Sequence, residues 1–282
     1  MADLLSRMAS LSAGRVAEAR GREGEAALLR RAHATPAAPP LVLHPDGFDL
    51  FAEIKRRAPS AGRLGAAREE DAEAAVRRAR GYSEAGAAAV SVLTEPDAFG
   101  GGLDDLEATA RAASVPVLRK DFIVDPYQVA EARAAGAGGV LLIVRLLEGT
   151  RLSETIGAAA GLGLFVLLEA FDESDLERAG EVAGPAGRAG ARLLAGVNAR
   201  DLATLEVDVS RLRRLSGRCP AGLTRVAESG LATPDDARRA AAWGYDAALV
   251  GRALMTTPEP EALARRMIAA GRRAARSRCA SA

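Results

Sequence analysis

Polar and ionisable side chains stand where several short apolar runs of the sequence end. One run ends at Lys120, a later run ends near Glu169, and the first run ends in Glu53 and Lys55. Amino and carboxyl groups that share a pocket shift one another's pKa by attraction and desolvation, which is what general acid–base catalysis requires. The candidates of this kind are Glu53, Lys55, Lys120, Asp121, Glu169, Asn198, Arg200, Glu228 and Ser229.

Each candidate alone has an ordinary structural explanation, since a lysine or glutamate at a strand end usually forms an ion pair at the rim of a sheet. As a set, two lysines and several carboxylates favour a catalytic pocket over rim ion pairs. A lysine donates a proton near neutral pH when burial or nearby cations lower its pKa, and carboxylates limit that fall. We therefore expect Lys120 to have a lowered pKa.

Two glycine-containing segments near the end of the sequence are suited to bind an anion. Ser229-Gly230 follows the seventh apolar run, and Gly251-Arg252 follows the eighth. Glycine amides beside a helix start form the usual phosphate site of (β/α)₈ barrels. Their positions after the last two runs favour a phosphate site over two unrelated structural glycines.

Eight apolar runs recur along the chain, each followed by a stretch with helical spacing. Continuous apolar strands separated by helices predict a parallel sheet, because a parallel connection needs a crossover of a dozen or more residues. Eight such units without a GxGxxG segment after the first favour a closed (β/α)₈ TIM barrel over an open doubly wound sheet. The predicted strands are Asp49–Lys55, Ala87–Thr94, Val115–Lys120, Gly139–Val144, Leu164–Ala170, Leu193–Asn198, Thr224–Ser229 and Ala247–Gly251.

The stretches between the runs are predicted to be helices, and several have recognisable ends. Asp125-Pro126 and Thr233-Pro234 place a capping residue before a proline in the first turn. The predicted helices are Asp71–Ala85, Leu103–Ala113, Pro126–Ala135, Leu147–Ala160, Ser174–Val182, Val209–Ser216, Pro234–Trp243 and Glu259–Ala270. In a barrel of this kind the strands' carboxyl ends meet on one face, which would bring the candidates together.

The chain is expected to divide into three parts. Residues 1–40 form an N-terminal helical extension that ends in the proline-rich linker Pro36–Pro40, and residues 41–270 form the catalytic barrel. Residues 271–282 form a basic C-terminal tail, and alanines between the arginines favour a solvated helix face over a binding patch.

Composition excludes several classes of partner. A net charge of +1 with interspersed signs gives no electrostatic case for nucleic acid or an anionic membrane. The longest apolar stretch is shorter than the roughly 20 residues that a membrane span needs. Cys219 and Cys279 have neither metal-ligand nor redox spacing, so we expect no metal and a cytoplasmic protein.

Several motifs occur in order between Phe51 and about Leu263, and together they resemble one enzyme family. They are FAEIKRRAPSAG, SVLTEPDAFGG, PVLRKDFIVDPYQVAEARAAGA, LLEAFD, GVNARDL, VAESG and ALVGRALM. The chain resembles indole-3-glycerol phosphate synthase, and the third motif is the most specific. The resemblance implies a ribulose-phosphate-binding barrel without a cofactor. It also implies that 1-(2-carboxyphenylamino)-1-deoxyribulose 5-phosphate closes to indole-3-glycerol phosphate, losing CO₂ and water, in tryptophan biosynthesis.

The resemblance also implies residue roles. Lys120 would protonate the substrate carbonyl, Glu169 would serve dehydration, and Glu53 would assist and orient. Lys55 and Arg200 would hold the substrate carboxylate. The other implied site residues are Asn198 for the hydroxyls, Ser229 and Glu228 for the network, Gly230 and Gly251 for the phosphate, Phe122 and Phe99 for the anthranilate ring, and Ser60, Leu202 and Arg252. For Phe99, a plain core position remains an equal alternative.

Two positions depart from the family's pattern. The family usually has Lys-x-Ser-Pro-Ser in the first loop, whereas this chain has Ala58 and retains Ser60. The missing hydroxyl would weaken substrate binding by about 1–3 kcal/mol if it is a buried partner. Arg252 stands where the family often has serine or glutamate, which a contact through the backbone amide would tolerate.

Three alternative functions make different demands on the sequence. A phosphoribosylanthranilate isomerase-like enzyme would need a cysteine and an aspartate as its acid–base pair, and no apolar run ends in cysteine. A paralogous phosphate-sugar barrel enzyme of specialised metabolism is compatible with Ala58. A barrel kept only to bind a partner would have lost Lys120 or Glu169. For the synthase we expect a monomer acting on a small phosphorylated substrate, with association to other tryptophan-pathway enzymes left open.

Overall fold

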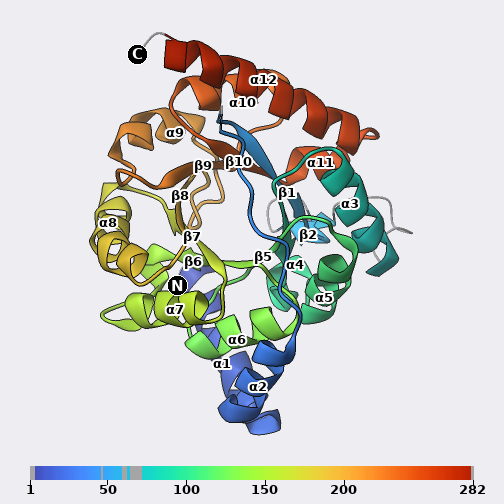
Figure 1. The fold of residues 1–282 in the computed structure, drawn as a ribbon, viewed down its shortest axis with the longest axis vertical. Coiled ribbons are helices and arrows are strands. Elements are labelled where there is room, and N and C mark those ends of the chain that lie inside the picture. Colours follow the sequence, from blue (N-terminus) through green and yellow to red (C-terminus); the bar gives the residue numbers. More distant parts are fainter. Residues whose placement is uncertain (1–3, 46, 59–61, 64–71, 281–282) are drawn as a thin grey trace.

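Eight parallel strands close into a barrel surrounded by helices (Figure 1). The computed structural model describes residues 4–45, 47–58, 62–63 and 72–280. The strand order around the barrel is β1-β10-β9-β8-β7-β6-β5-β4, which confirms the predicted (β/α)₈ architecture. The barrel strands are β1 (Asp49–Ile54), β4 (Ala89–Leu93), β5 (Val117–Lys120), β6 (Gly139–Ile143), β7 (Phe165–Ala170), β8 (Leu193–Asn198), β9 (Thr224–Glu228) and β10 (Ala247–Val250).

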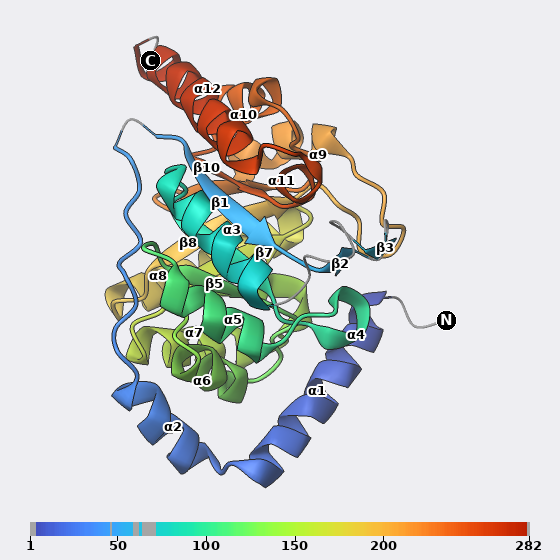
Figure 2. The same cartoon turned by 90° about the vertical axis from the view of Figure 1, so that its right-hand side faces the viewer.

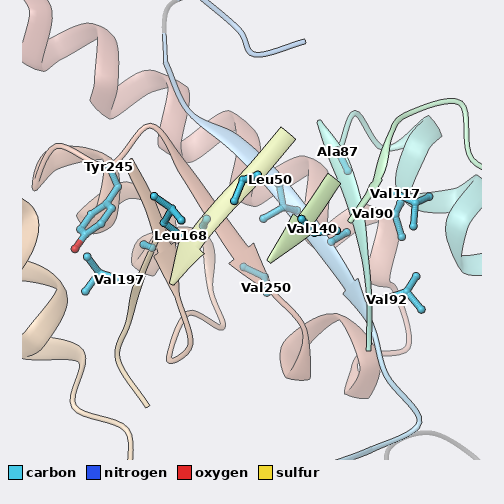
Figure 3. Packing of buried hydrophobic residues seen from close by; sticks show 14 of the residues in the cluster. Leu50, Ala87, Val90, Val92, Val117, Val140, Leu168, Val197, Tyr245 and Val250 are labelled. Carbon is cyan, nitrogen blue, oxygen red and sulfur yellow. The ribbon is translucent and has the colours of Figure 1, made fainter. Parts of the chain in front are cut away.

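Neighbouring residues of each strand pack on opposite sides of the barrel wall. Leu50 packs in the layer between strands and helices, and Phe51 packs inside the barrel. Figure 3 shows the outer layer, with Val140, Leu168 and Val197 among its residues. The side chains on both sides of the wall are buried. This explains why the strand sequences are continuous apolar runs and not alternating patterns.

The helices follow the strands in the predicted order. The Asp125 carboxylate accepts a hydrogen bond from Tyr127 N at the start of α6, and Thr233 forms a capping box at the start of α10. The longer helices of the barrel are α3 (Ala72–Glu84), α5 (Leu103–Ala112), α6 (Pro126–Ala134), α7 (Arg151–Gly161), α8 (Glu173–Arg188), α9 (Val209–Leu215), α10 (Pro234–Ala242) and α12 (Pro260–Ala280).

Short elements that the sequence did not predict lie in the loops. The loop after β1 contains a hairpin, the loop after β4 contains a single helical turn, and a short helix follows β10. These elements are β2 (Arg57–Ala58), β3 (Gly62–Arg63), α4 (Pro96–Phe99), α11 (Arg252–Thr256) and the 3₁₀ turns η1 (Val144–Leu146) and η2 (Ser216–Arg218). Because η1 takes up the start of its loop, α7 begins at Arg151 rather than at Leu147.

The N-terminal extension consists of α1 (Leu4–Arg22) and α2 (Glu25–Ala34). The two helices meet at an angle at one end of the molecule, and the chain then runs along the barrel to β1 (Figure 2). The buried Ser12 hydroxyl donates to Phe122 O at 2.6 Å and accepts from Gln128 Nε2 at 2.9 Å. These contacts attach α1 to the segment that follows β5.

The last helix extends beyond its predicted end. α12 continues through the basic residues to Ala280, so the boundary expected at 270/271 does not coincide with a helix end. Gly271 lies against the Phe48 ring, and Arg272 pairs with Asp49 at 2.8 Å. Contacts with β1 and α10 thus give the basic segment partners that its composition does not reveal. No helix among the described residues is both long and apolar enough to cross a membrane.

Replacing Ser12 with alanine is expected to lower the free energy of unfolding by about 1–3 kcal/mol, because Phe122 O and the Gln128 amide would each lose a buried hydrogen-bond partner. Urea unfolding measures the change. Ser10→Ala on the exposed side of the same helix is the control, expected within about 0.5 kcal/mol of the parent. Equal stability of the two variants would show that α1 is not fixed through Ser12.

Candidate active site

A pocket opens at the carboxyl ends of the barrel strands, with about 850 Å³ of space that reaches solvent. Ser60 lies outside the described residues. The pocket is lined by the other predicted site residues, namely Glu53, Lys55, Phe99, Lys120, Phe122, Glu169, Asn198, Arg200, Leu202, Glu228, Ser229, Gly230, Gly251 and Arg252.

The centre of the pocket is the ammonium group of Lys120. Its Nζ lies 3.3 Å from Glu169 Oε1 and 3.6 Å from Glu228 Oε2. These residues come from β5, β7 and β9, and alternate strands of such a barrel contribute side chains to one interior layer. Asn198 Nδ2 also donates to Glu169 Oε1, while Asn198 Oδ1 accepts from Arg200 N at 2.8 Å.

The pKa of Lys120 differs from the expectation. Burial acts to lower this pKa, but the negative charges of Glu169, Glu228 and Glu53 outweigh burial and raise it above its ordinary value. The expected lowering is therefore wrong in direction, because three carboxyl groups face this amine. At neutral pH Lys120 holds its proton, as a general acid must before it donates.

The pocket strongly perturbs the carboxyl group of Glu228. Burial, helped by the like charges of Glu169 and Glu53, raises the pKa of Glu228 to about 8, with Lys120 opposing the rise. Its side chain is 1% exposed, and neither oxygen has a hydrogen-bond partner among the described residues. A large fraction of Glu228 is consequently protonated at neutral pH.

Lys55 and Glu53 form a second charged pair at the end of β1. Lys55 Nζ donates to Glu53 Oε1. Gly251 lies so close that a Cβ atom there would be 2.0 Å from Glu53 Oε1 and 2.9 Å from Lys55 Nζ. Of the 38 lysines and arginines in the sequence, Lys55 and Lys120 are the only lysines, and both line this pocket.

Arg200 and Arg252 bring positive charge to the pocket. Arg200 Nη1 donates to Leu205 O at 2.8 Å. Burial and the nearby charge of Arg252 lower the pKa of Arg200. Neither guanidinium has a carboxylate ion pair among the described residues. Ser229 and Gly230 turn the loop after β9 with φ angles of 65° and 77°, a left-handed backbone that is strained for the serine.

Two phenylalanines form an aromatic wall of the pocket. The ring centroids of Phe99 and Phe122 lie 6.4 Å apart. Phe99 ends α4, and the Glu95 carboxylate accepts hydrogen bonds from the first amides of this turn. Arg15 of α1 pairs with Glu95 at 3.4 Å and with Asp121 at 3.6 Å. Phe99 is only partly buried, packs against the cluster inside the barrel and lines the pocket.

A family model described as indole-3-glycerol phosphate synthase matches residues 10–267 of the chain. The chain belongs to the indole-3-glycerol phosphate synthase family. This membership assigns it to tryptophan biosynthesis and does not favour the isomerase-like or paralogous alternatives.

Relatives with this name are similar over most of their length. The synthase of a Parafrankia species is 46% identical over 82% of this chain and 81% of its own. Synthase 1 of Streptomyces coelicolor is 42% identical over 96% and 92%, and the Mycobacterium tuberculosis synthase is 39% identical over 93% of each chain. Among solved structures, a thiamine phosphate pyrophosphorylase of Pyrococcus furiosus matches with a TM-score of 0.52 at 17% identity, over 80% of this chain and 96% of that one. That likeness shows the fold alone.

Some residues of the synthase pocket were not selected from the sequence. Most of them are apolar strand residues, which the sequence does not distinguish from core positions, and Leu231 lies in the loop after β9. Asp121 was recognised as a strand-end candidate but was given no role. The residues in question are Leu93, Asp121, Leu141, Ile143, Leu231, Leu249 and Val250. The described residues contain no group of three or more His, Cys, Asp or Glu side chains suited to hold a metal ion.

Glu228→Gln is expected to change how the stability of the synthase depends on pH. With its pKa raised from 4.5 to about 8, Glu228 binds a proton more tightly in the folded state than in the unfolded state. Its contribution to the free energy of unfolding therefore falls as pH rises through this window. Relative to the parent, the glutamine variant should gain at least about 1.4 kcal/mol between pH 4.5 and pH 8, the equivalent of one pKa unit.

Urea unfolding at several pH values measures this difference. Glu177→Gln, on the exposed surface of α8, is the matched control and should follow the parent. A constant difference between the Glu228 variant and the parent across the window would mean that Glu228 is ionised throughout.

Proposed function

We propose that the chain is a carbon–carbon lyase that closes 1-(2-carboxyphenylamino)-1-deoxyribulose 5-phosphate to indole-3-glycerol phosphate, with Lys120 as the proton donor. The observation that supports this mechanism is the contact of the protonated Lys120 with Glu169 and Glu228 at the centre of the pocket. A carbonyl that is attacked by carbon needs a proton donor at its oxygen, and the protonated Lys120 can supply this proton without a cofactor.

The reaction proceeds in three steps. The aryl carbon that bears the carboxylate forms a bond to the carbonyl carbon, and Lys120 gives its proton to the carbonyl oxygen. The carboxylate then leaves as CO₂, and its electron pair restores the aromatic ring. Finally Glu169 gives a proton to the new hydroxyl, which leaves as water as the ring-nitrogen electron pair moves toward the ring. Glu169 then takes up the proton lost from the carbon next to the nitrogen, which completes the indole. The protein's contribution is to position groups and move protons.

The remaining pocket residues bind and orient the substrate. The amides of Gly230 and Gly251 would hold the phosphate, and Lys55 with Arg200 would hold the carboxylate. The unpaired positive charge at this end of the pocket supports both assignments. Glu53 orients Lys55. Asn198 would contact the hydroxyls, Phe99 and Phe122 would pack on the anthranilate ring together with Leu202, and Ser60, Ser229, Glu228 and Arg252 would complete the site.

We further propose that the catalytic unit is residues 41–270, and that the protein works in the cytoplasm as a monomer on a small phosphorylated substrate. The catalytic unit is supported by the barrel strands and the pocket-lining residues, which all lie within this range. The cytoplasmic setting is supported by the lack of disulfide spacing between the two cysteines of the sequence. Association with other tryptophan-pathway enzymes stays open.

Lys120→Arg and Lys120→Met are both expected to lower kcat by about 10²–10⁴-fold, the usual contribution of a general acid. Arginine keeps the positive charge but does not release a proton in this pH range, so the arginine variant separates proton donation from electrostatics. Product formation from the carboxyphenylamino substrate is followed by indole fluorescence. Arg22→Met on the exposed face of α1 is the control. Parental turnover by the Lys120 variants would remove the assigned acid.

Arg252→Ser is expected to raise KM about tenfold at low ionic strength while kcat stays within about twofold, because a cation near an anion-binding site strengthens binding without entering the chemistry. The effect should shrink as salt is added, since screening weakens the attraction. Steady-state kinetics at two salt concentrations test this, with the exposed Arg273→Ser on α12 as control. A KM that does not change at either salt concentration would mean that only the backbone at 252 contributes.

A further inference from the structure

The side of Gly196 that faces the barrel interior is occupied by the carboxyl group of Glu228. A Cβ atom at position 196 would lie 2.0 Å from Glu228 Oε1 and 3.2 Å from Glu228 Cδ. A third contact, to Leu167 Cδ1, would be 3.1 Å. The first distance is far shorter than any van der Waals contact, so a side chain at 196 and the present position of Glu228 exclude each other.

No hydrogen bond from the described residues fixes the Glu228 carboxyl in the space beside Gly196. Its oxygens accept no hydrogen bond from the described residues, and Lys120 lies 3.6 Å away. In register, Gly196 is the partner of Glu169 in β7 and of Val226 in β9. The glycine therefore lies between the two strands whose carboxyl groups flank the lysine.

We propose that Gly196 is a positioning residue for the reaction, because its missing side chain provides the space that holds the Glu228 carboxyl beside Lys120. This inference rests on the proposed function and deepens it. With Glu228 in place, Lys120 contacts carboxyl groups from β7 and from β9. With Glu228 displaced, Glu169 alone would remain in contact with the ammonium group, which would move toward it.

The charged groups that face Glu228 decide the direction of the effect. They are Lys120 of β5, Glu169 of β7 and Glu53 of β1. Glu228 is one of the groups that raise the pKa of Lys120. Displacing it should lower that pKa, and the alkaline limb of the kcat profile, where Lys120 loses its proton, should move to lower pH.

A double-mutant cycle of Gly196→Ala and Glu228→Ala tests the proposal. Gly196→Ala should lower kcat on the order of tenfold, a fraction of a general acid's full contribution, and shift the alkaline limb to lower pH, with KM within about threefold. In the Glu228→Ala background the added methyl group enters vacated space, so the same substitution should cost less than about twofold in kcat. Glu228→Asp, with its shorter side chain, should restore part of the kcat lost by Gly196→Ala.

The unfolding free energy of the four proteins provides a readout that needs no turnover. Gly196→Ala should destabilise the parent and should be neutral or stabilising in the Glu228→Ala background. If Gly196→Ala alone does not fold, a folded double variant supports the proposal. If neither folds, the contact with Leu167 is responsible and the proposal is wrong. If the parent protein shows no turnover, the proposed function is wrong. The stability cycle then still tests whether Gly196 determines the position of the Glu228 carboxyl group.

Gly139→Ala is the matched control. This barrel glycine of β6 also lacks room for a Cβ atom, which would lie 2.4 Å from the Phe165 ring and not near a carboxyl group. We expect lower stability with an unchanged alkaline limb. The same shift of the limb in Gly139→Ala, equal losses of kcat in both backgrounds of the cycle, or parental kcat in Gly196→Ala would each overturn the proposal.

Discussion

A largely buried ammonium group between two buried carboxyl groups is the constraint on which the structure of this pocket depends. Removing one charge from water is costly, and the cost is recovered only where opposite charges lie at contact distance. Lys120 meets Glu169 and Glu228 at such distances because β5, β7 and β9 are alternate strands of a closed barrel. The compensation is incomplete, since Glu228 holds its proton near neutral pH. The pocket thus holds a protonated amine beside a carboxyl group whose pKa lies near neutral pH.

The carboxyl-end face also depends on chain segments that are distant in sequence. Ser12 of α1 hydrogen-bonds to the backbone of Phe122, and Arg15 pairs with Asp121, the neighbour of Lys120. The same arginine pairs with Glu95 at the start of the turn that ends in Phe99. The N-terminal extension is therefore attached to both sides of the aromatic wall, and its folding is coupled to the shape of the pocket.

The sequence predicted the barrel and the membership of the pocket because both follow from local patterns. Continuous apolar runs indicate strands that are buried on both faces. A polar residue at the end of such a run must lie on the face where the carboxyl ends of the strands meet. What could not be predicted depends on distances between strands. The sign of the pKa shift of Lys120 follows from how many carboxyl groups reach it. The space at Gly196 follows from the register of β8 and β9, and the length of α12 follows from the contact of Gly271 with Phe48.

The near absence of lysine from the sequence has a practical consequence. Arginine fills the surface positions where lysine is usual, so Lys55 and Lys120 are the sole side-chain primary amines of the chain. Reductive methylation with isotopically labelled formaldehyde would therefore place its spectroscopic probes in this pocket and on the terminal α-amine. The two ε-amino resonances would report ligand occupancy of the pocket without assignment of the rest of the spectrum.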